Sequence, residues 1–186
     1  MWKFMALSQQ KFREIVLQLL YSQDIAHPDE NIMTDLIMNE LSISKKNVRL
    51  AQEKVQKIVV QLAEIDSKIS SVSLSYHFNR IQIVTKNILR LGVFELFFET
   101  DIPQKVVIAE AIRLSRKFST PESASFVNAL LDQLYQKSKG EEVNSNLLVE
   151  SSQILEQSEQ VAADFSLESP LSKEKHNEIL NSHENT

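Results

Sequence analysis

The chain has 186 residues, with 2 glycines, 4 prolines and no cysteine. Sheet proteins depend on glycine and proline for their turns, so this composition favours an all-helical fold. The lack of cysteine excludes disulfides, thiolate metal sites and cysteine nucleophiles. The amino end turns polar at Ser8, too early for a secretory segment, and no apolar run approaches the roughly 20 residues of a membrane span. We therefore expect a cytoplasmic protein with no membrane contact.

Charge divides the chain into two parts. Residues 140–186 hold ten acids and two bases, a net charge of −8 within an overall −5. The remaining 18 bases and 15 acids give residues 1–139 a net charge of +3. We predict a mildly basic folded domain at 1–139 and an acidic tail at 140–186. Because few apolar residues punctuate the tail, we expect it to be mostly disordered; the alternative is a helix over residues 146–165 that docks on the body.

The first predicted helix begins after Ser8, whose hydroxyl can cap the first turn, and ends before Pro28. Apolar residues recur along it at helical spacing: Phe12, Ile15, Val16, Leu19 and Leu20. A short second helix is predicted at about residues 29–41. After Ser44 the pattern predicts one long helix to Ile69, because apolar residues alternate steps of three and four.

Three further helices are predicted in the second half of the body. The helix at 78–100 contains Gly92, which costs about 1 kcal/mol relative to alanine unless another element approaches closely. We therefore expect a helix crossing there. A helix follows Pro103, and the last opens with Thr120-Pro121-Glu122, a capping hydroxyl and a proline at the first position, and fades near Gly140. In all, the pattern predicts six to seven helices and no strand.

Residues for catalysis or metal binding do not form a constellation. His27 and His77 have no partner ligands at metal-binding spacing, so no metal site is expected. A glycine-rich phosphate loop is excluded because the only glycines are Gly92 and Gly140. We interpret the chain as a binding protein rather than an enzyme, with no cofactor.

Three blocks in the second half of the body carry a resemblance. They are residues 88–96 (ILRLGVFEL), Pro103 followed by 107–114 (VIAEAIRL), and Lys117-Phe118 followed by Ser123 and 126–132 (FVNALLD). In order and spacing these blocks resemble the NusB family of transcription antitermination factors, and a looser similarity extends over residues 8–137. The resemblance implies two small helical bundles packed together and no catalysis. It also implies binding to the boxA element of ribosomal RNA leaders as a heterodimer with the ribosomal protein NusE, which helps load other antitermination factors onto RNA polymerase.

The resemblance also assigns residues. The family's first helix begins with an arginine-rich stretch that here reads QQKFR at residues 9–13, so two charges are missing and weaker, less salt-sensitive RNA binding is expected. The RNA-binding residues that it implies are Lys11, Arg13, Gln18, Tyr21, Glu122, Ser125 and Phe126. Phe126 either stacks on an unpaired base or belongs to the core. Thr85 and Lys86 are expected on the NusE-binding face.

One alternative to this function is kept. The missing charges favour a helical interaction scaffold, a homodimer or a NusE-binding protein, whose RNA binding is weakened. A NusB-like domain of an RNA methyltransferase is set aside, because the chain has no room for a catalytic domain. A further hypothesis is that the acidic tail folds over the basic edge of the body and competes with RNA.

Overall fold

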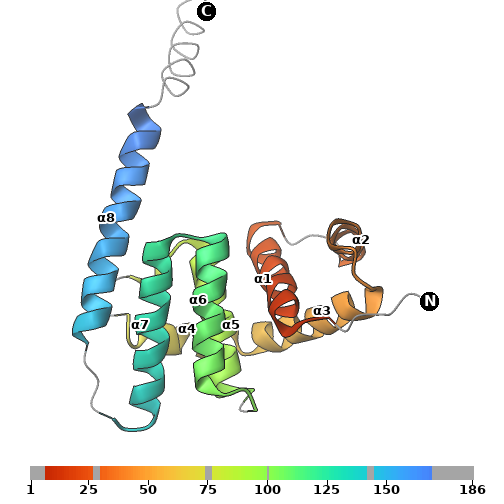
Figure 1. The fold of residues 1–186 in the computed structure, drawn as a ribbon, viewed down its shortest axis with the longest axis horizontal. Helices are drawn as coiled ribbons and strands as arrows, with labels where there is room; N and C mark the ends of the chain where they lie inside the picture. The colour runs from red at the N-terminus through yellow and green to blue at the C-terminus, as the bar shows by residue number, and fades with distance from the viewer. Residues whose placement is uncertain (1–6, 27–29, 74–76, 100, 142–144, 169–186) are drawn as a thin grey trace, which may run out of the picture.

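The computed structural model describes residues 7–26, 30–73, 77–99, 101–141 and 145–168. Within these ranges the chain forms eight α-helices, one 3₁₀ helix and no strand (Figure 1), so the all-α prediction is confirmed. The elements are α1 (Gln9–Ala26), α2 (Glu30–Leu41), α3 (Lys45–Val60), α4 (Leu62–Ser70), η1 (Phe78–Arg80), α5 (Ile83–Phe97), α6 (Gln104–Phe118), α7 (Pro121–Ser138) and α8 (Asn146–Glu168). None of the helices described has both the length and the apolar character to cross a membrane.

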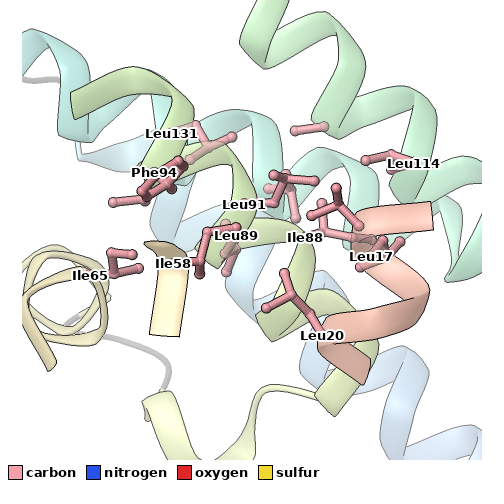
Figure 2. Close-up of a cluster of buried hydrophobic side chains, with 14 of the residues drawn as sticks. Leu17, Leu20, Ile58, Ile65, Ile88, Leu89, Leu91, Phe94, Leu114 and Leu131 are labelled. Carbon is pink, nitrogen blue, oxygen red and sulfur yellow. The ribbon is translucent and has the colours of Figure 1, made fainter. Parts of the chain in front are cut away.

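The helices form two packed bundles, as expected. Helices α1, α2 and α3 lie at one end of the molecule, and α4, α6 and α7 gather with α5 at the other (Figure 1). Helix α5 also contacts α1 and α3, so it joins the two bundles. Its side chains supply much of the shared core in Figure 2, where Ile88, Leu89, Leu91 and Phe94 meet residues of five other helices.

The predicted helix caps are present. The Ser8 hydroxyl accepts a hydrogen bond from the Lys11 backbone N–H (3.2 Å), which satisfies one free amide of the first turn of α1. The Ser44 side chain accepts from the backbone N–H of Asn47 (3.4 Å) at the start of α3. Thr120 Oγ1 accepts from the Ser123 N–H (3.1 Å), with Pro121 at the first helical position of α7. These local signals explain why the starts of three helices were correctly predicted.

The long helix predicted from Ser44 to Ile69 is interrupted, and this prediction was wrong. Gln61 has φ −98° and ψ 7°, and its N–H bonds the Ile58 carbonyl (3.1 Å), a 3₁₀ contact that ends α3. Ile58 and Ile65 are both fully buried, α3 belongs to the first bundle and α4 to the second. A straight helix presents its apolar side chains in one continuous stripe. The chain must therefore bend at Gln61 for the apolar faces of α3 and α4 to pack in different bundles. With α8, this bend takes the helix count above the predicted six to seven.

Gly92 lies where α5 crosses α7. A Cβ atom at this position would lie 2.9 Å from Leu131 Cδ1, closer than real Cβ contacts come. The expected close approach is therefore confirmed, although the neighbour is a side chain of α7 rather than its backbone. Leu131 is fully buried, so packing in the core offsets the helix propensity lost at Gly92.

The acidic segment differs from the prediction of a mostly disordered tail. Residues Asn146–Glu168 form α8, which packs along α7. Leu148 and Leu155 are buried seven residues apart, on one face of the helix, and Ser151 and Ser152 between them are also buried. The alternative of a docked helix therefore holds for this part of the segment. The mostly polar composition of the segment masked its narrow apolar stripe. Residues 169–186 lie outside the described residues.

Candidate nucleic-acid interface

The outer edge of α1 meets α6 in a cluster of charges around Glu14. Glu14 Oε1 accepts a hydrogen bond from Arg113 Nη1 (2.7 Å), and Oε2 lies 2.8 Å from Lys117 Nζ and 3.8 Å from Lys11 Nζ. We call Lys11, Glu14, Arg113 and Lys117 the Glu14 cluster. Its carboxylate is buried, whereas the side chains of Lys117 and Lys11 are 49% and 36% exposed. Three cations thus share one buried anion, and their outer ends face solvent.

The Glu14 carboxyl remains ionised under this arrangement. Burial by itself raises the pKa of Glu14, but hydrogen bonds from Lys117 and Arg113, with their charges, outweigh burial and lower the pKa below its ordinary value. For Arg113, a cation, burial by itself lowers the pKa. Its hydrogen bonds to Glu14 and Glu110, with their charges, outweigh burial and raise the pKa of Arg113 above its ordinary value. The anion therefore holds the cations in fixed positions, which reduces the entropy they lose when they bind an external anion.

Arg13 belongs to a different, internal network. Its Nε donates to both carboxylate oxygens of Glu95, at 3.0 and 2.9 Å. Lys54 Nζ lies 2.6 Å from Glu95 Oε1 and 2.7 Å from Glu99 Oε2. Arg13, Lys54 and Glu95 are all buried, so these bonds join α1, α3 and α5 inside the protein. The structure contradicts an RNA contact at Arg13, because its guanidinium is already paired and shielded from solvent.

Gln18 and Tyr21 line a groove beside the Glu14 cluster. Their helix, α1, forms this groove of about 500 Å³ with Ile83 and Val84 of α5 and Phe118 of α6. Tyr21 is 41% exposed, and Ile83 is exposed to a similar extent. Lys117 Nζ lies 5.3 Å from the centre of the Phe118 ring, so Lys117 links the cluster to the groove. We call this surface the Tyr21 groove.

The start of α7 carries the other predicted RNA contacts. Helix α7 begins three residues after α6 ends, so Glu122 and Ser125 lie close to the carboxyl end of α6. Ser125 is exposed and its hydroxyl donates to the Pro121 carbonyl (3.4 Å), while Glu122 is half-buried. Phe126, by contrast, is fully buried in the core. Of the two alternatives for Phe126, the structure supports the core and contradicts stacking on a base.

Thr85 is a structural residue rather than an exposed partner contact. It is buried, and its hydroxyl forms hydrogen bonds with Ser119 Oγ (3.0 Å) and Ser123 Oγ (3.4 Å). These bonds tie α5 to the start of α7, and they correct the prediction that Thr85 faces NusE. Lys86 is half-buried with its ammonium 4.8 Å from the centre of the Phe78 ring. The exposed apolar residue of this region is Ile83, in the Tyr21 groove.

Comparison with known proteins decides the family. A sequence model of the NusB family matches residues 10–136. The chain belongs to the NusB family. It is 37% identical over 140 residues to the transcription antitermination protein NusB of Chlamydia pneumoniae, covering 75% of this chain and 86% of the relative. It is 40% identical over 130 residues to the NusB of Geobacter sp. (strain M21), covering 66% and 90%.

Solved NusB structures share the fold. T. maritima NusB aligns with a TM-score of 0.63 at 31% identity, over 72% of this chain and 94% of that one. A crystal structure of the antitermination factors NusB and NusE in complex with dsRNA aligns with a TM-score of 0.60 at 26% identity, over 69% and 96%. The NusB match stops at residue 136, so α8 lies outside it.

Two cations of this NusB-family surface were not assigned to it from the sequence. Arg113 and Lys117 read as an outer face of α6, about 100 residues from Lys11, and nothing local connects them with α1. The available signal was Glu14, an acid on the same polar edge as Lys11, Gln18 and Tyr21, which needs a compensating charge once buried. Only the bonds that Arg113 and Lys117 of α6 make with Glu14 of α1 show where that charge comes from.

Proposed function

We propose that this chain is a transcription antitermination factor that binds boxA RNA of ribosomal RNA leaders together with the ribosomal protein NusE. The observation that carries the proposal is the Glu14 cluster, whose cations are held beside the exposed Tyr21. Membership of the NusB family supports it, as does the solved complex of NusB and NusE with dsRNA. In this role the protein acts in the cytoplasm with RNA polymerase and further antitermination factors.

Each part of the surface has a chemical task in this proposal. Lys11, Arg113 and Lys117 pair with RNA phosphates, which gives affinity that falls with salt. The Tyr21 ring stacks on an unpaired base, worth about 1–3 kcal/mol, and the Gln18 amide can hydrogen bond to a base edge. Ser125 and Glu122 lie where ribose hydroxyls or base amino groups can bind them.

The apolar side of the Tyr21 groove is our proposed NusE contact. Ile83 is exposed and adjoins Val84, while Lys86 lies one turn further along α5. An exposed apolar floor with a polar rim is typical of a protein-binding surface. RNA would then follow the charged edge of α1 and α6, and NusE the floor at α5.

An RNA titration tests this function. Fluorescence anisotropy of a labelled boxA RNA is measured against the protein at low salt, with and without NusE. We expect Lys117→Gln to weaken binding about tenfold, equivalent to about 1.4 kcal/mol, because it removes a phosphate contact. Lys105→Gln on the same helix, also an exposed lysine, is the matched control and should bind as the natural chain does. Absence of binding both with and without NusE would refute the proposal.

A protein-interaction scaffold is the second candidate. It is favoured by the burial of Arg13, which leaves the partly exposed Lys11 as the one cation that reaches solvent in the first turns of α1. Charge reversal at Lys11 and Lys117 separates the two functions. Loss of RNA binding with NusE binding retained supports the antitermination factor, whereas an unchanged RNA signal supports the scaffold. Sedimentation of the chain alone tests its homodimer form.

A further inference from the structure

We propose that α8 is an intramolecular gate on the RNA-binding edge of α7, an inference that rests on the proposed function. In the docked position α8 holds acidic side chains beside the start of α7 and lowers RNA affinity. RNA binding requires α8 to move away. The helix lies outside residues 10–136, which the NusB family model matches.

The direction of α8 places its acidic half at the RNA-binding end of α7. The two helices run antiparallel, and α8 continues past the start of α7 (Figure 1). At the other end, Gln133 Nε2 of α7 donates to Ser145 Oγ (3.4 Å), directly before the start of α8. Further along, Ile154 of α8 lines the same cavity as Ser125 of α7. Residues that follow Ile154 therefore lie toward Glu122 and the first turn of α7.

The charge of α8 opposes an RNA backbone. Its 23 residues include Glu150, Glu156, Glu159, Asp164 and Glu168 and no base. Glu156 Oε1 lies 2.6 Å from Arg80 Nη1, so α8 also pairs with a cation of η1. In sequence, Arg80 lies shortly before the α5 residues that line the Tyr21 groove. Like charges near a binding edge reduce the local concentration of an anionic ligand. Movement of α8 removes these acids from the edge and breaks the ion pair between Arg80 and Glu156.

The α7–α8 interface is built so that it can open. Among residues 146–163 of α8, whose burial the structure describes, the large apolar side chains that are buried are Leu148 and Leu155. A cavity of about 290 Å³ remains between the helices, and polar residues of α7 such as Asn128 and Gln136 line it. Gln133 Oε1 is buried there without a hydrogen bond to any described residue. An unsatisfied acceptor and incomplete packing both weaken docking, in contrast to the tight crossing of α5 and α7 at Gly92.

Point variants of the full chain test the gate by the RNA titration described above. Leu155→Asn removes a buried anchor, and Glu156→Gln removes one acid and its bond to Arg80. We expect each to bind RNA about three- to tenfold more tightly than the natural chain, because docking competes with RNA. The controls are Val161→Asn, at a 68% exposed position of α8, and Glu141→Gln, at the far end of α7. Both controls should bind like the natural chain.

Hydrogen exchange of the natural chain gives an independent measurement. Amide protons of α8 should exchange faster when RNA is bound, since the helix leaves α7. Unchanged exchange of α8, or equal RNA affinity in all five proteins, overturns the gate and leaves the proposed function standing. If no variant binds RNA at all, the proposed function fails and the gate fails with it.

Discussion

Glu95 and Glu14 are both buried carboxylates, but they differ in whether their cationic partners are also buried. Glu95 is enclosed with Arg13 and Lys54, and all three charged groups are shielded from solvent. Glu14 is also buried, but its partners Lys117 and Lys11 extend into solvent. The first carboxylate therefore organises the interior, and the second holds cations at the surface, where the proposed RNA ligand would meet them.

Removal of Glu95 should destabilise the protein strongly. Glu95→Ala leaves Arg13 and Lys54 buried without their shared anion, at an expected cost of about 3–5 kcal/mol in the free energy of unfolding. Urea denaturation followed by circular dichroism measures it. Glu64→Ala is the control: its exposed pair with Lys68 (3.2 Å) should contribute at most about 1 kcal/mol. Equal effects of the two substitutions would contradict an internal role for Glu95.

Glu14 should make stability depend on pH in the acidic range. Its pKa is lower in the folded chain than the ordinary value of 4.5, so the folded state favours the ionised form. Its contribution is present in full above about pH 4.5 and is lost as pH falls through the depressed folded pKa. Glu14→Gln should therefore be less stable than the natural chain at pH 7, by a margin that shrinks as the pH falls below about 4.5. Urea midpoints across this range measure the margin, and a constant margin would contradict the prediction.

At the scale of elements, α7 has two different faces. Its core face holds Phe126, Leu130 and Leu131, all fully buried, and its start presents Ser125 to solvent. Helical periodicity identified the core face, yet it could not tell whether Phe126 lies inside or at the edge. The packing of α7 against α5 and α6 decides this.

The cap of α7 should hold its exposed start in place. Thr120→Ala removes the acceptor for the Ser123 N–H and should reduce stability by about 0.5–2 kcal/mol. Because Ser123 also bonds Thr85, the loss should loosen the link between α5 and α7 as well. Thermal unfolding measures the first effect, and amide exchange at residues 121–125 the second. Ser125→Ala, which leaves the cap intact, should change neither by a comparable amount.

At the scale of the whole molecule, the net charge conceals two segments of opposite charge. The −5 of the chain combines a basic body with an acidic segment, and that segment is in part a docked helix. If the proposed function holds, RNA affinity should depend on where the charges lie and not on their sum.

The salt dependence of RNA binding should report how many phosphates the Glu14 cluster contacts. With three cations and about 0.7 per phosphate for single strands, the plot of log affinity against log salt should have a slope of about −2. Lys117→Gln should reduce its magnitude by about 0.7, while Lys105→Gln leaves it unchanged. A slope that is the same in all three proteins would show that the cluster does not meet the backbone.

Composition, periodicity and caps determined much of this protein by themselves. The scarcity of glycine and proline indicated an all-helical chain, and Ser8, Ser44 and Thr120 marked helix starts, because these signals act within a few residues. The family resemblance likewise indicated two bundles, and it suggested one edge of α1 as an RNA-binding surface. The bend at Gln61 was not visible, because periodicity continues through a site where the chain changes cores.

Only the tertiary structure decided which polar residues are available to a ligand. Arg13 and Lys11 lie two residues apart, yet one is buried against Glu95 and the other faces solvent. Lys117 and Lys11 lie together because both pair with Glu14, and α8 lies beside Ser125. Both arrangements depend on contacts between distant parts of the chain. Burial and charge pairing depend on neighbours that are far away in sequence, whereas turn and helix preferences depend on neighbours that are near.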